Sequence, residues 1–235
     1  MSTPTVLDLA SPRLPSIAEA ARPQREHRSR ASSESLAKRG VDILGSALGL
    51  LLLLPILLVV AALVAITSPG GALYRQTRVG LDGQPFSMIK FRTMRSDSDD
   101  VLVRLKAVAG ASGTASGPLF KLVDDPRVTP LGRILRRFSI DELPQLVNVL
   151  RGDMSLVGPR PALPAEVDAY CPRALRRLEV VPGMTGAWQV GGRSTLSWEE
   201  GLDLDLHYVD RWSLRYDAAI LLQTVRAVVA PVGAY

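Results

Sequence analysis

Cysteine and histidine are nearly absent from this sequence of 235 residues. It contains one cysteine, Cys171, and two isolated histidines, His27 and His207. A single cysteine excludes an internal disulfide framework and is typical of a protein kept in a reducing compartment. A metal site built from histidine and cysteine is also excluded, because the sequence lacks the ligands for it.

Aromatic residues are scarce as well, at 5% of the chain. They do not alternate with basic residues as they do in RNA-binding modules, so nucleic acid is not an expected partner. The net charge is nevertheless +5. This charge favours another anionic partner, such as a nucleotide-sugar or the anionic face of a membrane.

Apolar residues, in contrast, make up 47% of the chain, and one long run of them carries no charge. This run, Ile43 to Ile66, has 24 residues and is long enough to cross a bilayer. Pro55 near its middle must bend a helix. Three interpretations compete: a cleaved signal peptide, a straight single span, and a re-entrant hairpin that bends at Pro55 and returns. The run is too long for a typical signal peptide.

Basic residues flank the apolar run on both sides. Lys38 and Arg39 precede it, and Arg75, Arg78 and Lys90 follow it. Positive residues prefer the cytoplasmic side of a membrane. The sequence therefore favours the re-entrant hairpin, with both ends in the cytoplasm.

The chain divides into three predicted parts. Residues 1–35 are rich in Pro, Ser, Ala and Arg without a period, which predicts a disordered tail. Residues 36–70 form the membrane anchor. Residues 71–235 are predicted to form one compact domain, because the remaining length suits one.

The pattern over 71–235 predicts mainly helices with one small β-hairpin. The hairpin covers 72–94 and turns near Asp82-Gly83. Lys90 and Arg92 share a strand face and would present two cations to a diphosphate, or else form a solvated basic face. The predicted helices cover 97–109, 129–138, 163–180, 197–212 and 217–229, and a short strand covers 119–123.

Two segments of this domain have features that bear on its surroundings. The 163–180 segment has basic residues beside apolar ones, which predicts either a helix on the membrane surface or a core-packed helix with a solvated face. The glycine-rich segment 181–193 predicts a loop whose backbone approaches a ligand closely.

The stretch from Ser139 to Pro161 opens with two adjacent carboxylates, Asp141 and Glu142. Apolar residues at helical spacing follow them, and Gly152 predicts the helix end. The helix starts either at a Ser139–Glu142 capping box or near Asp141 itself. In both cases the helix dipole favours an ionised Asp141. The two carboxylates would otherwise serve only as a cap and a complement to the dipole.

These motifs resemble those of the bacterial sugar transferase family. The resemblance rests on Asp-Glu-Leu-Pro-Gln-Leu at 141–146 and Gly-Asp-Met-Ser-Leu-Val-Gly-Pro-Arg-Pro at 152–161. Lys-Phe-Arg-Thr-Met at 90–94, Asp-Pro-Arg at 125–127 and a Pro-Gly-x-Thr-Gly block at 182–186 extend it. The family comprises small monotopic enzymes that move a sugar 1-phosphate from a UDP-sugar onto undecaprenyl phosphate.

The resemblance implies a covalent mechanism and a set of site residues. Asp141 would attack the sugar-bearing phosphorus, and UMP would leave. Glu142 would hold the cofactor, a Mg²⁺ ion that bridges the diphosphate. The substrate-binding residues implied by the motifs are Lys90, Arg92, Arg136, Arg160 and Arg193.

The resemblance also implies where the protein works and with what. The expected fold is mainly α with a small β-hairpin, a re-entrant membrane helix hairpin and amphipathic interfacial helices. The protein would sit in the inner membrane, with its catalytic domain facing the cytoplasm. Its partners would be the UDP-sugar, undecaprenyl phosphate and membrane lipid, with a homo-oligomer left open.

Other function classes remain open at this stage. The main alternative is a non-enzymatic membrane-anchored scaffold whose basic surface binds anionic lipid or a partner. A secreted envelope protein with a signal peptide and an inactive family member are the others. Nothing in the sequence identifies the sugar.

Overall fold

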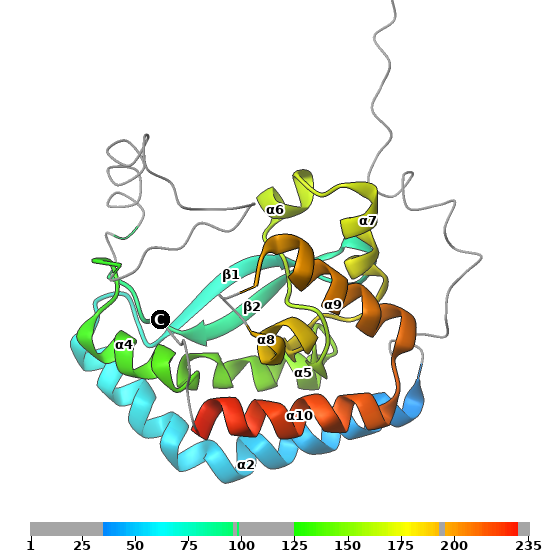
Figure 1. Ribbon diagram of the computed structural model, residues 1–235. Helices are drawn as coiled ribbons and strands as arrows, with labels where there is room; N and C mark the ends of the chain where they lie inside the picture. The colour runs from blue at the N-terminus through cyan, green and yellow to red at the C-terminus, as the bar shows by residue number, and fades with distance from the viewer. Residues whose placement is uncertain (1–34, 96–97, 99–124, 193–195, 230–235) are drawn as a thin grey trace, which may run out of the picture.

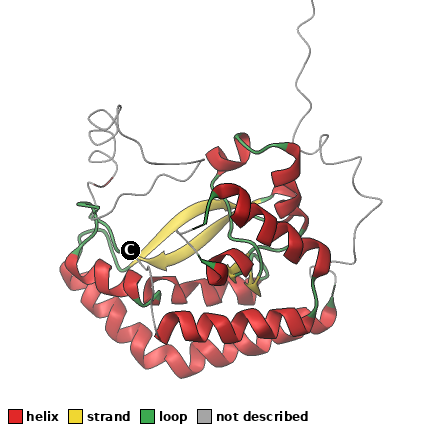
Figure 2. Cartoon of the chain, viewed as in Figure 1, coloured by secondary structure: helices red, strands yellow, loops and turns green. Residues whose placement is uncertain are grey.

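Helices surround a small β-hairpin in the computed structural model, which describes residues 35–95, 98, 125–192 and 196–229 (Figure 2). The elements are α2 (Leu36–Thr67), β1 (Leu73–Val79), η3 (Leu81–Gly83), β2 (Pro85–Phe91), α4 (Pro130–Arg137), η4 (Ile140–Gln145), α5 (Leu146–Arg151), β3 (Ser155–Val157), α6 (Pro164–Asp168), α7 (Pro172–Leu175), η5 (Arg176–Glu179), β4 (Gly183–Thr185), α8 (Ala187–Gly191), α9 (Trp198–Arg211) and α10 (Leu214–Val229), where η marks a 3₁₀-helix. The prediction of a mainly helical fold with a small hairpin is confirmed. The predicted tail, the helix over 97–109 and the strand over 119–123 lie almost entirely outside the described residues.

The hairpin β1–β2 lies at the centre of the molecule, with α2 and α10 on one side and α6 and α7 on the other (Figure 1). Its strands pair antiparallel, with Tyr74 opposite Lys90. The connection contains Asp82 at φ 53° and Gly83 at φ 76°, and short polar residues and glycine tolerate this left-handed conformation best. The predicted Asp-Gly turn is therefore confirmed.

A second, parallel pair of strands, β3 and β4, was not predicted. Its second strand, β4, lies in the glycine-rich segment 181–193, which the sequence predicted to be a loop close to a ligand. A Cβ on Gly183 would lie 2.0 Å from the Gly158 nitrogen, and one on Gly186 would lie 2.2 Å from the Gly158 oxygen. These glycines therefore allow two backbone segments to pack together, and the predicted loop is wrong over β4 and α8.

The helix predicted after Asp141 is divided into two parts. The first, η4, is a 3₁₀-helix that contains Pro144, and only from Leu146 does the chain become α-helical as α5. Ser139 has φ 56° and its side chain makes no capping hydrogen bond, so the predicted capping box is wrong. Gly152, at φ 94°, ends α5 as expected.

The segment predicted as one helix over 163–180 forms three short pieces, α6, α7 and η5. Its arginines face acidic residues of α9: Arg173 bonds Asp203, Arg176 bonds Asp210, and Arg177 bonds Asp205. Because these side chains pair within the protein, the prediction of a membrane-surface helix is not supported. The core-packed alternative describes the segment better.

Helix α2 is the one helix among the described residues that is long and apolar enough to cross a membrane. It runs unbroken through Pro55, and Figure 1 shows it bending near its middle. Its exposed apolar side chains are concentrated along the central part: Leu44, Leu48, Leu51, Leu52, Leu54, Ile56, Leu58, Val59 and Leu63. The sequence predicted a bend at Pro55, and the structure shows one continuous helix that bends near its middle.

The N-terminal end of α2 is fastened to the rest of the protein by charged side chains. Lys38 Nζ lies 2.7 Å from Asp217 Oδ2 in α10, and both residues are buried. Arg39 donates hydrogen bonds to the carbonyls of Val149 and Leu150 at the end of α5, at 2.6 and 2.7 Å. Lys38 and Arg39 thus bind protein groups, although the sequence presented them as membrane-flanking charges.

The other end of α2 packs on the same part of the protein. Val60 and Val64 are buried in a cluster with Phe91 of β2 and Leu135 of α4. Both ends of the apolar helix therefore dock on the body that carries the hairpin and η4.

Candidate active site

Asp141 lies in η4, which packs against β2 and α4. The residue is 7% exposed. Within the described part of the chain, its carboxylate forms no ion pair and no hydrogen bond to another side chain. It accepts a hydrogen bond from its own backbone N–H. A buried carboxylate without a partner is uncommon, because burial disfavours its charge.

Burial and, to a smaller extent, the neighbouring Glu142 raise the pKa of Asp141 to about 6. Lys90 and Arg136 act in the opposite direction. The expectation that a helix dipole lowers this pKa is therefore wrong, since η4 is a short 3₁₀-helix and burial has the larger effect. At neutral pH the carboxylate is still mostly ionised, as a nucleophile must be.

Lys90 faces the same place from β2. Burial and the charge of Arg78 lower the pKa of Lys90 to about 8, although Asp141 acts in the opposite direction. The Lys90 ammonium lies 5.5 Å from the centre of the Tyr74 ring across the hairpin. It forms no ion pair within the described residues, so its charge is available to an anionic ligand.

Arg136 reaches the site from the last turn of α4. Its Nε donates a 2.9 Å hydrogen bond to Thr93 Oγ1, which fixes the guanidinium beside the end of β2. Burial lowers the pKa of Arg136, while Asp141 raises it, followed by Asp125. Asp125 itself is bound by Arg127 at 2.6 Å, so its carboxylate stabilises a turn.

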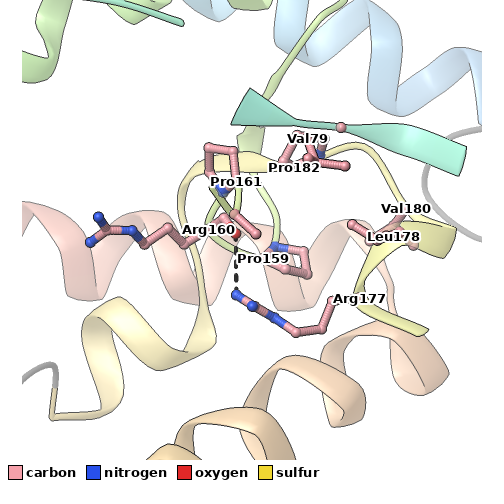
Figure 3. A pocket seen from close by; sticks show the side chains of 10 residues that line it. Val79, Pro159, Arg160, Pro161, Arg177, Leu178, Val180 and Pro182 are labelled. Carbon is pink, nitrogen blue, oxygen red and sulfur yellow. Dashed lines mark hydrogen bonds between the residues drawn. The ribbon is translucent and has the colours of Figure 1, made fainter. Parts of the chain in front are cut away.

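Arg160 and Arg92 occupy different positions relative to this cluster. Arg160 is half-buried in the turn between Pro159 and Pro161, and its guanidinium points away from the apolar hollow beside that turn (Figure 3). Asp141 does not line this hollow. Arg92 donates to the carbonyls of Gly70 and Gly71 just after α2. Arg92 therefore braces the end of the anchor, and Arg193 lies outside the described residues.

Glu142 is exposed next to the buried Asp141. No group of three or more metal-ligating side chains occurs within the described ranges. Mg²⁺ needs fewer protein ligands than that, because it commonly binds one or two carboxylates together with substrate phosphates. The exposed carboxylate of Glu142 fits such a role.

Sequence reasoning did not assign Arg78 to the site. This buried arginine of β1 lies close enough to Arg160, Glu166 and Glu142 for their charges to affect its pKa, which burial lowers to about 10. The signal was present in the sequence, because Tyr74, Gln76 and Arg78 share one strand face and Tyr74 pairs with Lys90. The site thus gathers four cations around two carboxylates.

This arrangement fits an enzyme that handles anionic substrates beside a membrane. The model of the family described as "Bacterial sugar transferase" matches residues 33–231. The chain belongs to the bacterial sugar transferase family.

Several characterised proteins are similar to this chain along most of its length. The exopolysaccharide production protein ExoY of Rhizobium meliloti is 40% identical over 200 residues, which is 85% of this chain and 88% of that protein. The UDP-glucose:undecaprenyl-phosphate glucose-1-phosphate transferase of Caulobacter vibrioides is 44% identical over 210 residues, 85% of this chain and 72% of that protein. The undecaprenyl-phosphate galactose phosphotransferase of Salmonella typhimurium is 42% identical over 204 residues, 86% of this chain but 42% of that longer protein.

The family resemblance seen in the sequence is thereby confirmed. The prediction that the protein is an enzyme, a phosphoglycosyl transferase, is confirmed with it. The roles of the individual site residues, the metal and the membrane topology stay predictions.

Proposed function

We propose that this protein transfers a sugar 1-phosphate from a UDP-sugar to undecaprenyl phosphate and releases UMP, as the first membrane step of surface polysaccharide synthesis. Two relatives support this reaction, because both names state undecaprenyl phosphate and one of them also states a UDP-sugar donor. The single structural observation that supports it most is the buried, unpaired Asp141 among cations. A scaffold that binds lipid through its surface would have no use for such a residue.

The reaction proceeds in two displacements at one phosphorus atom. A carboxylate oxygen of Asp141 attacks the sugar-bearing phosphorus, and the bond from this phosphorus to the oxygen bridging it to UMP breaks. UMP leaves with the bonding electron pair. A phosphate oxygen of undecaprenyl phosphate then attacks the same phosphorus, and the Asp141 carboxylate leaves.

The cations stabilise the negative charge that moves between these groups. Lys90 and Arg136 are the cations whose charges lower the pKa of Asp141. Fixed cations in a partly buried site stabilise a phosphoryl transition state more than they would in water. When bound, a Mg²⁺ ion held by Glu142 and the diphosphate would neutralise further charge on the phosphates.

The two docked ends of α2 support a re-entrant anchor in the inner membrane. Lys38 and Val64 both contact the body that carries the site, which supports an arrangement with both ends of the helix on one face of the membrane. The exposed apolar middle dips into the bilayer between them. The site then meets the lipid phosphate at the cytoplasmic surface, where UDP-sugars are made.

The direct test uses purified protein, undecaprenyl phosphate and a panel of UDP-sugars, with release of UMP as the readout. We expect one or a few sugars to release UMP over many turnovers only when the lipid phosphate and Mg²⁺ are present; without the lipid phosphate, release should stop at about one UMP per protein molecule. Glu142→Gln should raise the Mg²⁺ concentration needed for half-maximal rate. Release of no UMP with any sugar would favour the scaffold instead.

Topology is tested separately by labelling cysteines in intact cells. Ser2→Cys and Asp100→Cys are placed on either side of α2 in a Cys171→Ser background, because Cys171 is exposed and would react. We expect neither position to react with a reagent that cannot cross the inner membrane. Labelling of one position alone would refute the re-entrant anchor.

A further inference from the structure

Arg78 is a buried arginine of β1. It is 4% exposed, and within the described ranges no carboxylate lies at ion-pair distance from it. Its Nη1 donates a 3.0 Å hydrogen bond to the carbonyl oxygen of Pro161, and its Nη2 donates a 2.8 Å bond to Gln76 Oε1. Burial of an unneutralised guanidinium costs free energy, so a purely structural reason for it is weak.

The bond to Pro161 acts on the turn that carries Arg160. Neither Pro159 nor Pro161 has a backbone N–H to donate, so the hydrogen bonds that hold this turn are mainly those that its carbonyl oxygens accept. Four successive carbonyls, from Pro159 to Ala162, accept hydrogen bonds from four different donors. The donors are the Gly183 N–H at 2.9 Å, Arg177 Nη2 at 3.1 Å, Arg78 Nη1 at 3.0 Å and the Val79 N–H at 2.9 Å.

The two arginines that hold this turn differ in one respect. Arg177 is buried against Asp205 at 2.9 Å, and its guanidinium contacts the neighbouring rings of Tyr170 and Trp198, at 5.6 Å from each centre. Its charge is satisfied without any ligand. Arg78 instead extends from the hairpin face that carries Lys90 and reaches the Arg160 turn directly. Arg78 thus links the hairpin side of the site to the turn.

We propose that Arg78 is a positioning residue for nucleotide diphosphate binding: by holding the Pro161 carbonyl, it fixes the turn so that the Arg160 guanidinium meets the diphosphate. This inference rests on the proposed function, since it takes the UDP-sugar as the ligand. Arg78 acts through Arg160 and need not touch the substrate itself. The proposal therefore predicts that the two arginines are coupled energetically.

The test is a double-mutant cycle on UDP affinity, measured by calorimetry with the full-length protein in nanodiscs and Mg²⁺. Arg78→Met and Arg160→Gln should each weaken binding about 10- to 100-fold, as for a lost hydrogen bond to a charged group. The double variant should bind no more than about 3-fold more weakly than Arg160→Gln alone. Arg78→Lys, which keeps one donor for Pro161, should recover most of the affinity.

Two controls separate positioning from folding. Arg75→Gln changes an exposed arginine on the same strand and should leave UDP affinity unchanged. Thermal unfolding of each variant shows whether the fold survives, and Arg78→Lys keeps the test open if Arg78→Met does not fold.

The outcomes distinguish this inference from the proposed function. Independent, additive losses from Arg78→Met and Arg160→Gln would overturn the positioning role while leaving the transferase intact. Unchanged affinity in Arg78→Met would do the same. If the wild-type protein releases UMP in the panel assay but the mutant cycle shows no coupling, this inference alone is contradicted. If the wild-type protein neither releases UMP nor binds UDP, both are contradicted.

Discussion

Two regions of this protein are rich in basic residues, but among the residues that the structure describes their cations are paired with carboxylates in one region and unpaired in the other. We call them the transfer site, with Arg78, Lys90, Arg136 and Arg160 around Asp141 and Glu142, and the α9 face, with Arg173, Arg176 and Arg177. On the α9 face each arginine pairs with an aspartate of α9. In the transfer site, within the described residues, no cation has an ion pair within 4 Å.

The difference shows how a basic residue is used. Paired charges stabilise the contact between two elements, and little is left over for a ligand. Unpaired cations in a partly buried site lower the free energy of unfolding. An anionic ligand neutralises them and restores that free energy. The pairing of each cation, rather than the number of cations, separates the transfer site from the α9 face.

The largest expected effect is on the one buried carboxylate of the transfer site. Asp141→Asn should reduce UMP release by at least about 10⁴-fold, because the nucleophile is gone. The variant should also be more stable. A pKa raised from 3.8 to about 6 costs the fold up to about 3 kcal/mol at pH 7.

The pH dependence gives this stability effect a sign that can be checked. The cost is absent below pH 3.8, where Asp141 is protonated in both states, and is complete above pH 6. The stabilisation by Asp141→Asn, measured by urea unfolding, should therefore shrink as the pH falls from 7 to 4. If Asp141→Asn is less stable than wild type at pH 7, the charge of Asp141 does not destabilise the fold, and this account of its surroundings is refuted.

The second effect concerns the buried ion pair of the α9 face. Arg177→Met should destabilise the protein by about 3–5 kcal/mol, because Asp205 is left buried and uncompensated. Arg78→Met should cost much less stability, since it leaves no carboxylate behind. Urea unfolding of both variants at pH 7 compares them, and equal losses would remove the distinction between the two regions.

A third effect is the pH profile of kcat/KM for UMP release. Activity should fall below about pH 6 as Asp141 becomes protonated, and above about pH 8 as Lys90 loses its charge. Lys90→Arg keeps a charge at high pH, so this variant should lose the alkaline decline and keep the acid one. An unchanged alkaline decline in Lys90→Arg would exclude Lys90 as its source.

The smallest expected effect is at the exposed edge of the α9 face. Arg173→Gln removes a surface pair with Asp203, which should change the free energy of unfolding by less than about 1 kcal/mol. It should leave UMP release unchanged. A loss of activity here would mean that the paired region also takes part in the reaction.

Local pattern was enough to predict much of the fold. Strand alternation and the Asp82-Gly83 turn predicted the hairpin. The helix predicted over 197–212 corresponds to α9, and the structure shows a capping box between Ser197 and Glu200 at its start. Motif resemblance led to the correct family. These features depend on residues close together in sequence, so the sequence alone carries them.

What failed depends on contacts between distant segments. The pKa of Asp141 is governed by burial under β2 and α4, which no local pattern reveals. The pairing of Arg177 with Asp205 spans 28 positions, so the sequence could not decide between a membrane-surface helix and a core-packed one. Arg78 was overlooked for the same reason, because its partner Pro161 lies 83 positions away.

The most direct test of the central claim is to look for the bond between Asp141 and phosphorus. Purified protein is mixed with its UDP-sugar without lipid acceptor, quenched, digested and analysed by mass spectrometry. The account predicts a phosphosugar on the peptide containing Asp141, which disappears when undecaprenyl phosphate is added and never forms in Asp141→Asn. Glycolipid formation at the full rate by Asp141→Asn, or with no adduct on this residue at any time, would contradict it.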